Sequence, residues 1–163
     1  MSAIISLCGL YRYRLERECG EGLPTAVIMV NPSTADADQD DATIRKLKGF
    51  AAHNGWGKLI VGNLFAYRAT DVRELARVAD PIGPECDGRL AEIFMDAGRV
   101  VFGWGPLSKQ PKYQRARWRK VYEIAARLGH EPFCIGPPAK CGHPCHPLML
   151  PYASEIMPWH PPT

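Results

Sequence analysis

The sequence predicts an α/β domain built on a central, mostly parallel four-stranded sheet flanked by helices. Three observations predict this class. Continuous apolar runs of strand length occur four times, amphipathic helical patterns separate them, and Asn, Gly or Pro punctuates their ends. Strands that alternate with helices are typical of parallel sheets with right-handed crossovers.

The composition predicts one domain that spans residues 1–163. The chain is 46% hydrophobic, enough to bury one core, and carries a net charge of +3. No run is long enough to cross a membrane, and no basic segment precedes the first apolar residues. Six scattered cysteines fit reduced thiols. We therefore expect a cytoplasmic protein with no membrane contact, and we favour a monomer.

The first half of the chain begins with a predicted β-hairpin, at about residues 4–10 and 11–18. The first central strand, residues 26–30, is apolar throughout, as expected when both faces are covered. A helix follows from about Asp41, whose side chain can cap it. Residues 59–65 form the second buried strand.

The second half repeats the alternation of helices and strands. The predicted order is two helices, a strand, a helix and a strand, at residues 71–78, 84–97, 100–102, 115–128 and 133–135. A Pro-rich tail from about residue 157 is predicted to be loosely held.

Two asparagines mark strand ends, which is where α/β sheets bind ligands. Asn31 precedes Pro32 and Ser33, a pattern that fits either a simple turn or a binding loop. Asn63 lies within an apolar run, where an unpartnered amide costs about 1–3 kcal/mol. Backbone groups or a ligand must therefore satisfy it. An amide offers a donor and an acceptor, which suits the edge of a nucleobase.

Two histidines and two cysteines fall within residues 141–146, directly after Lys140. Pro144 and Pro147 stiffen this loop. The histidines and cysteines can bind zinc, but their close spacing and the prolines disfavour wrapping around one ion. We expect the loop to present one imidazole, from His143 or His146, as a hydrogen-bond or proton donor. Neither a metal nor a cofactor is predicted.

Six cations interleave with Tyr113 and Trp118 in residues 109–120. This pattern suits contact with phosphates and stacking, although a solvated helix face has the same composition. The predicted phosphate contacts are Lys109, Lys112, Arg115, Arg117 and Arg119. Nucleic acid or a nucleotide is the expected partner.

Taken in order, the strand ends resemble the motif set of the uracil-DNA glycosylase superfamily. The Asn31-Pro32 pair is similar to its water-activating motif, and Asn63 to the asparagine that reads a pyrimidine. Trp104-Gly105 follows the third strand, and His143-Pro144 or His146-Pro147 resembles its leaving-group loop. The resemblance implies the fold of that superfamily and cleavage of an N-glycosidic bond.

The sequence departs from this pattern at Asn31, because an amide cannot act as a general base. Either Asn31 only positions the water, and the rate comes from stabilisation of the leaving group, or a carboxylate such as Asp36 acts as the general base in its place. Segments 31–36 and 63–70 also resemble a family of uncharacterised bacterial and phage proteins, over nearly the whole chain. That resemblance brings no activity with it.

The predicted function is hydrolysis of the bond between a sugar and a modified or mismatched base. The predicted catalytic residues are Asn31, Asp36, His143 and His146, with His146 preferred because Leu148, beside Met149, follows as a wedge-sized residue. The predicted substrate-binding residues are Pro32, Ser33, Asn63, Tyr67, Arg68 and Trp104. A non-catalytic nucleotide or nucleic-acid binding module is the alternative, and a small metal-binding protein is a third.

Overall fold

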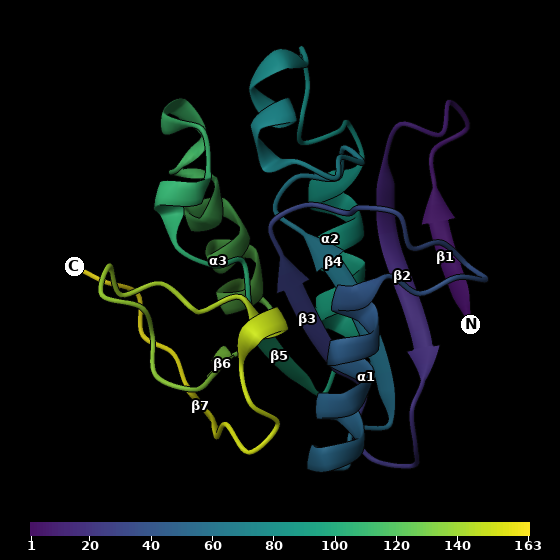
Figure 1. The fold of residues 1–163 in the computed structure, drawn as a ribbon, viewed down its shortest axis with the longest axis vertical. Helices are drawn as coiled ribbons and strands as arrows, with labels where there is room; N and C mark the ends of the chain where they lie inside the picture. Colours follow the sequence, from purple (N-terminus) through teal and green to yellow (C-terminus); the bar gives the residue numbers. More distant parts are fainter.

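The computed structural model describes all residues from 1 to 163, arranged around one seven-stranded sheet (Figure 1). The strand order across the sheet is β1-β2-β4-β3-β5-β6-β7. The strands are β1 (Ser2–Ile5), β2 (Arg12–Glu18), β3 (Thr25–Met29), β4 (Lys58–Asn63), β5 (Arg99–Phe102), β6 (Phe133–Ile135) and β7 (Ile156–Pro158).

The four central strands are adjacent and parallel, in the order β4, β3, β5, β6. The other three pairings are antiparallel: β1 with β2, β2 with β4, and β6 with β7. The predicted four-stranded, mostly parallel sheet is therefore wrong, because the sheet is larger and mixed. The N-terminal hairpin forms as expected, but β2 also joins the sheet by pairing with β4, with Leu15 opposite Val61.

Three α-helices cover the two faces of the sheet: α1 (Ala42–Asn54) on one, α2 (Cys86–Asp96) and α3 (Arg117–Arg127) on the other (Figure 1). Helix α1 begins as predicted, because Asp41 Oδ1 accepts a hydrogen bond from the Ile44 amide at 2.9 Å. It ends at Gly55, whose φ of 69° favours glycine. The helix expected at residues 71–78 is a 3-10 helix, η1 (Val72–Arg77).

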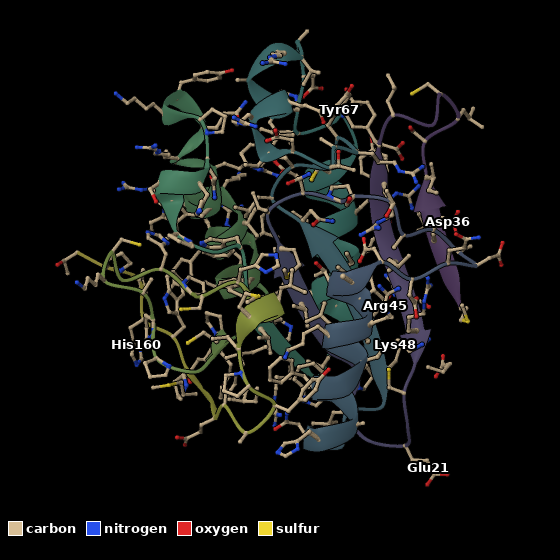
Figure 2. All side chains as sticks on the ribbon, in the orientation of Figure 1. Glu21, Asp36, Arg45, Lys48, Tyr67 and His160 are labelled. Carbon is tan, nitrogen blue, oxygen red and sulfur yellow. The ribbon has the colours of Figure 1, made fainter.

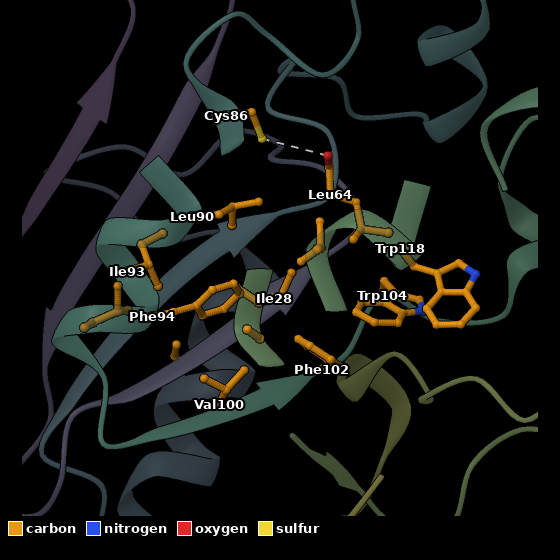
Figure 3. Packing of buried hydrophobic residues seen from close by; sticks show 14 of the residues in the cluster. Ile28, Leu64, Cys86, Leu90, Ile93, Phe94, Val100, Phe102, Trp104 and Trp118 are labelled. Atoms are coloured by element: carbon orange, nitrogen blue, oxygen red, sulfur yellow. Dashed lines mark hydrogen bonds between the residues drawn. The ribbon is translucent and has the colours of Figure 1, made fainter. Parts of the chain in front are cut away.

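The core lies on both faces of the central strands, which explains their continuous apolar character. Figure 3 shows the larger cluster, in which Ile93 and Phe94 of α2 pack beside Ile28 of β3. Gly62 permits this close approach of helix and strand: a Cβ there would lie 2.9 Å from the side chains of Leu90 and Ile93.

The C-terminal segment is part of the core, so the prediction of a loose tail is wrong. Strand β7 pairs with β6, and Trp159 is only 2% exposed. The Trp159 indole donates its Nε1–H to the Gly142 carbonyl oxygen at 2.9 Å and packs edge-on against Trp104 and Trp118. A three-residue strand that ends in proline gives almost no sequence signal.

The connections contain three more 3-10 helices: η2 (Leu107–Lys109), η3 (Lys112–Gln114) and η4 (Pro147–Met149). None of the helices is long and apolar enough to cross a membrane.

Candidate functional site

A cleft lies at the carboxyl ends of the central strands, the edge where parallel sheets bind ligands. It consists of three cavities, of about 610, 270 and 40 Å³, and His146 lines all three. We call them the outer, side and floor cavities. Asn31 and Ser33 line both the outer and the floor cavity, so the two cavities adjoin.

The floor cavity brings together residues that are far apart in sequence. Asn31 and Ser33 follow β3, Asn63 ends β4, and His146 precedes η4. Arg12 of β2 and, at the start of α1, Asp41 and Thr43 complete the polar lining. The three central predicted residues, Asn31, Asn63 and His146, thus line one space, as the predicted order of strand ends required.

Asn63 is the most unusual residue of the cleft. It is 2% exposed, and neither its Nδ2 nor its Oδ1 has a hydrogen-bond partner in the protein. Burying such an amide costs about 1–3 kcal/mol, and buried polar groups are nearly always paired. Its backbone is fixed by the register of β4 on β3, where it lies opposite Met29. The side chain therefore offers a donor and an acceptor to a ligand atom in the floor cavity.

Asn31 is held in one orientation by its own loop. Its Nδ2 donates to the Ala69 carbonyl oxygen at 2.7 Å and to the Pro32 carbonyl oxygen at 3.1 Å. The Oδ1 atom remains without a protein partner, so it can accept a hydrogen bond from water or a ligand. An amide in this position orients a molecule but does not remove a proton.

His146 is set up as a neutral hydrogen-bond donor. Its Nδ1 accepts a hydrogen bond from the Leu148 amide at 3.2 Å, which places the proton of the neutral ring on Nε2. Burial lowers the pKa of His146, while the charge of Asp41 opposes the shift. A neutral imidazole with Nε2–H can stabilise negative charge that develops on a ligand oxygen.

His143 does not reach the cleft, so of the two predicted histidines only His146 lines it. It is 3% exposed and packs among aromatic rings, with its ring centre 4.8 Å from that of Trp118. Its Nδ1 accepts a hydrogen bond from Trp104 Nε1 at 3.3 Å. Burial lowers its pKa, so the ring is a neutral part of the core. The structure holds no group of three or more His, Cys, Asp or Glu side chains that could bind a metal ion.

Three other predicted residues lie outside the three cavities. The carboxylate of Asp36 accepts hydrogen bonds from the amides of Asp38 and Gln39, and these bonds lower its pKa. It closes a turn over the β1–β2 side of the sheet, as Figure 2 shows. Tyr67 pairs with Tyr11, edge to face, and Arg68 bonds through its amide to the Leu10 carbonyl. Asp36 is therefore not placed to activate water in the cleft.

The remaining predicted binding residues lie at the cleft in different ways. Trp104 is 2% exposed and contributes to the side cavity. Ser33 lines the floor and outer cavities. Pro32 is buried, and its carbonyl oxygen accepts a hydrogen bond from the Ala69 amide, which fixes the loop that carries Asn31.

The five cations predicted to bind phosphate separate into two groups. Lys109 lines the side cavity, and Lys112 and Arg119 are exposed. Arg117 is engaged inside the protein: it is 2.6 Å from the Asp87 carboxylate and donates to the Leu64 carbonyl oxygen. Arg115 donates to two carbonyl oxygens of its own loop. Only the first group is available to a ligand.

Sequence reasoning missed Arg12, Thr43 and Arg73, which also line the cleft. Arg12 is 3% exposed although it lies in a strand rich in charged residues, RYRLERE, which looks like a solvent-exposed strand. Its burial depends on the loop around Ala35, whose carbonyl oxygen accepts from Arg12 Nη1 at 2.8 Å. No local pattern in the sequence predicts the contact between Arg12 and the Ala35 carbonyl oxygen.

Comparison with known proteins gives one match. Residues 12–148 match the family model described as "Protein of unknown function (DUF1643)". No curated protein matches the chain, and neither does any solved structure. These comparisons lend no support to a relationship with the uracil-DNA glycosylases, whereas the expected membership of an uncharacterised family is confirmed. The matched segment runs from the start of β2 into η4 and includes every residue of the cleft named above, so the chain belongs to the DUF1643 family of proteins of unknown function.

Proposed function

We propose that the cleft binds a nucleobase attached to its sugar and hydrolyses the N-glycosidic bond between them. The observation that carries the proposal is the unpartnered amide of Asn63 at the floor of the cleft. An amide that is buried without a partner is matched by a ring edge that presents both a donor and an acceptor. Nucleobases present such edges.

The chemistry follows from what the neighbouring side chains offer. Water attacks C1′ of the sugar, its oxygen forms the new C1′–O bond, and the electron pair of the C1′–N bond leaves with the base. One proton of the water passes to the departing base through solvent. Asn31 Oδ1 orients the water, and the Nε2–H of His146 stabilises negative charge on an oxygen of the base.

The surface around the cleft fits a substrate that carries phosphates. Lys109 is exposed and lines the side cavity, whereas Arg73 on the outer cavity is paired with Asp71 at 2.7 Å. Leu148 and Met149, which follow His146, are 38% and 88% exposed and can pack against bases that flank the bound one. Nucleic acid is therefore the proposed partner.

One observation favours a second function, a nucleotide or nucleic-acid binding module without catalysis. The carboxylates that line the cleft are occupied: Asp41 caps α1, and Asp71 forms an ion pair with Arg73 at 2.7 Å. Both carboxylates already accept hydrogen bonds from the protein, and we assign neither of them as a general base. In the catalytic proposal, the rate therefore comes from stabilisation of the leaving group.

The test is release of base in a single turnover, measured on oligonucleotides and nucleosides that carry mismatched or modified bases. We expect His146→Gln to lower the rate by about 100-fold or more and to change substrate affinity much less, since the charge it stabilises appears only as the base departs. His53→Gln, at an exposed position near the end of α1, is the matched control and keeps the parental rate.

Two outcomes would contradict the catalytic proposal. Base release at the parental rate by His146→Gln would remove the proposed role of the imidazole. Tight binding across the substrate panel with no release of base by the parent protein would favour the non-catalytic module.

A further inference from the structure

Arg12 is a buried cation that forms no ion pair. It is 3% exposed, and its Nε–H has no hydrogen-bond partner. The charge of Asp41, which lines the same cavity, raises the pKa of Arg12 but does not supply that partner. The two other buried arginines of β2 differ from it: Arg14 is paired with Glu16 and Asp96, and Arg17 with Asp40. Burying a guanidinium donor without an acceptor is costly, so a missing partner is expected.

The unpartnered atoms of Arg12 and Asn63 belong to residues that line the same cavity, of only about 40 Å³. Such a space holds one or two small groups, not a whole ring. It therefore receives the edge of a ligand whose remainder lies in the outer cavity. Together, the two side chains offer two kinds of donor, Arg12 Nε–H and Asn63 Nδ2–H, and one acceptor, Asn63 Oδ1.

An asparagine alone does not select one ring edge over another. Its amide can turn by 180°, so it pairs equally with a carbonyl beside an N–H or with an amino group beside a ring nitrogen. A second, fixed donor removes this ambiguity. A carbonyl oxygen has two lone pairs and accepts from both donors, whereas a ring nitrogen has one and an amino group donates.

We propose that Arg12 is a ligand-binding residue that shares a ligand carbonyl oxygen with Asn63 and so restricts the floor cavity to rings with a C=O next to an N–H. The inference rests on the proposed function for the statement that the ring is a nucleobase. Burial lowers the pKa of Arg12 to about 10 and the charge of Asp41 opposes the shift, so the pKa stays well above neutral pH and the side chain remains a donor. An arginine cannot become an acceptor for an amino group.

The test compares rings that differ only at this edge and have no sugar to lose. The probes are 9-methylhypoxanthine against 9-methyladenine, and 1-methyluracil against 1-methylcytosine. For the parent protein we expect each carbonyl ring to bind on the order of tenfold tighter than its amino counterpart, because the amino edge leaves a buried group unpaired. In Arg12→Met, which keeps the apolar stem, the preference falls to about threefold or less. Arg14→Met is the matched control on the same strand and keeps the preference.

A second measurement needs no variant and covers the case in which Arg12→Met does not fold. On addition of 9-methylhypoxanthine to the parent protein, the NMR signal of Arg12 Nε–H shifts, and that of Arg14 Nε–H does not. An unshifted Arg12 signal, equal binding of both rings of each pair, or a preference that survives in Arg12→Met overturns the inference. These probes carry no sugar, so their binding tests the inference separately from hydrolysis. A protein that binds them selectively but releases no base from nucleosides or oligonucleotides would refute the proposed hydrolysis and leave the inference standing.

Discussion

At the scale of single residues, Asn63 and Arg12 combine unpartnered buried polar atoms with a place on a cavity. Gln110 also has an unpartnered buried amide, but it lines none of the three cavities. Asn63 and Arg12 are buried as deeply as the apolar core, yet three of their polar atoms have no partner. A protein selected only for stability would place apolar side chains there. The unfavourable burial is thus best explained by binding, and this explanation can be tested without knowing the ligand.

Asn63→Leu is predicted to stabilise the protein while it abolishes binding in the floor cavity. The substitution keeps a similar shape and removes two unpartnered polar atoms from a site that is 2% exposed. We expect the free energy of unfolding to rise by about 1–2 kcal/mol, measured by urea denaturation.

The matched control is Gln114→Met. Gln114 is also a buried amide, and its Oε1 has no partner, but its Nε2 donates to the Leu75 carbonyl oxygen at 2.9 Å. Loss of that bond should lower the free energy of unfolding by about 1 kcal/mol. A clear loss of stability in Asn63→Leu would mean that the amide is satisfied in the folded protein, and its assignment as a ligand contact would fail.

The sequence allowed some of these residues to be predicted and not others. Asn63 was identifiable because a polar residue inside an apolar strand contradicts its surroundings. The preference for His146 over His143 rested only on the residues that follow each His-Pro pair. The burial of His143 depends on Trp159, which packs beside it and directly follows a strand that the sequence did not reveal. Asp36 was wrongly placed in the cleft, because a carboxylate that closes a turn looks the same in sequence as a free one.

At the scale of elements, the sequence predicted an element correctly where its hydrophobic periodicity agreed with its capping residues. Helix α1 begins directly after Asp41, the cap that the sequence predicted. The mixed character of the sheet was not predictable in this way, because the pairing of β2 with β4 is set by contacts between residues about 45 positions apart. The same limit applies to the basic segment 109–120, in which tertiary contacts decide which cations are free.

The basic segment should contribute to nucleic-acid binding through Lys109 and Lys112 rather than through its arginines. Lys109→Ala and Lys112→Ala should each reduce the slope of log K against log salt by about 1, because each contact with a phosphate releases counterions. Lys120→Ala is the control, since Lys120 lies on α3 beside α2, away from the cleft. The measurement is a salt titration of binding to a short oligonucleotide. Unchanged slopes for both variants would assign these lysines to a solvated surface.

At the scale of the whole molecule, one face of the sheet carries residues of the cleft, and the other carries the aromatic cluster that positions the loop of His146. The side covered by α1 includes the loops that bury Arg12 and carry Asn31 toward the cleft. The other side holds an aromatic cluster in which Trp104, Trp118, His143 and Trp159 meet. This cluster fixes the loop between β6 and η4, and through it the position of His146.

The C-terminal strand should therefore be essential for stability, although it adds only three residues to the sheet. Trp159→Ala is expected to lower the free energy of unfolding by about 3–5 kcal/mol, because it removes a large side chain that is 2% exposed. Trp159→Phe should cost less, and part of that cost is the hydrogen bond to the Gly142 carbonyl oxygen. Trp56→Phe is the matched control, since Trp56 is equally buried but its Nε1 has no partner to lose. Urea denaturation of the three variants measures these differences. If Trp159→Ala unfolds within 1 kcal/mol of the parent, the tail is peripheral after all, and His146 must be positioned by α1 and η4 alone.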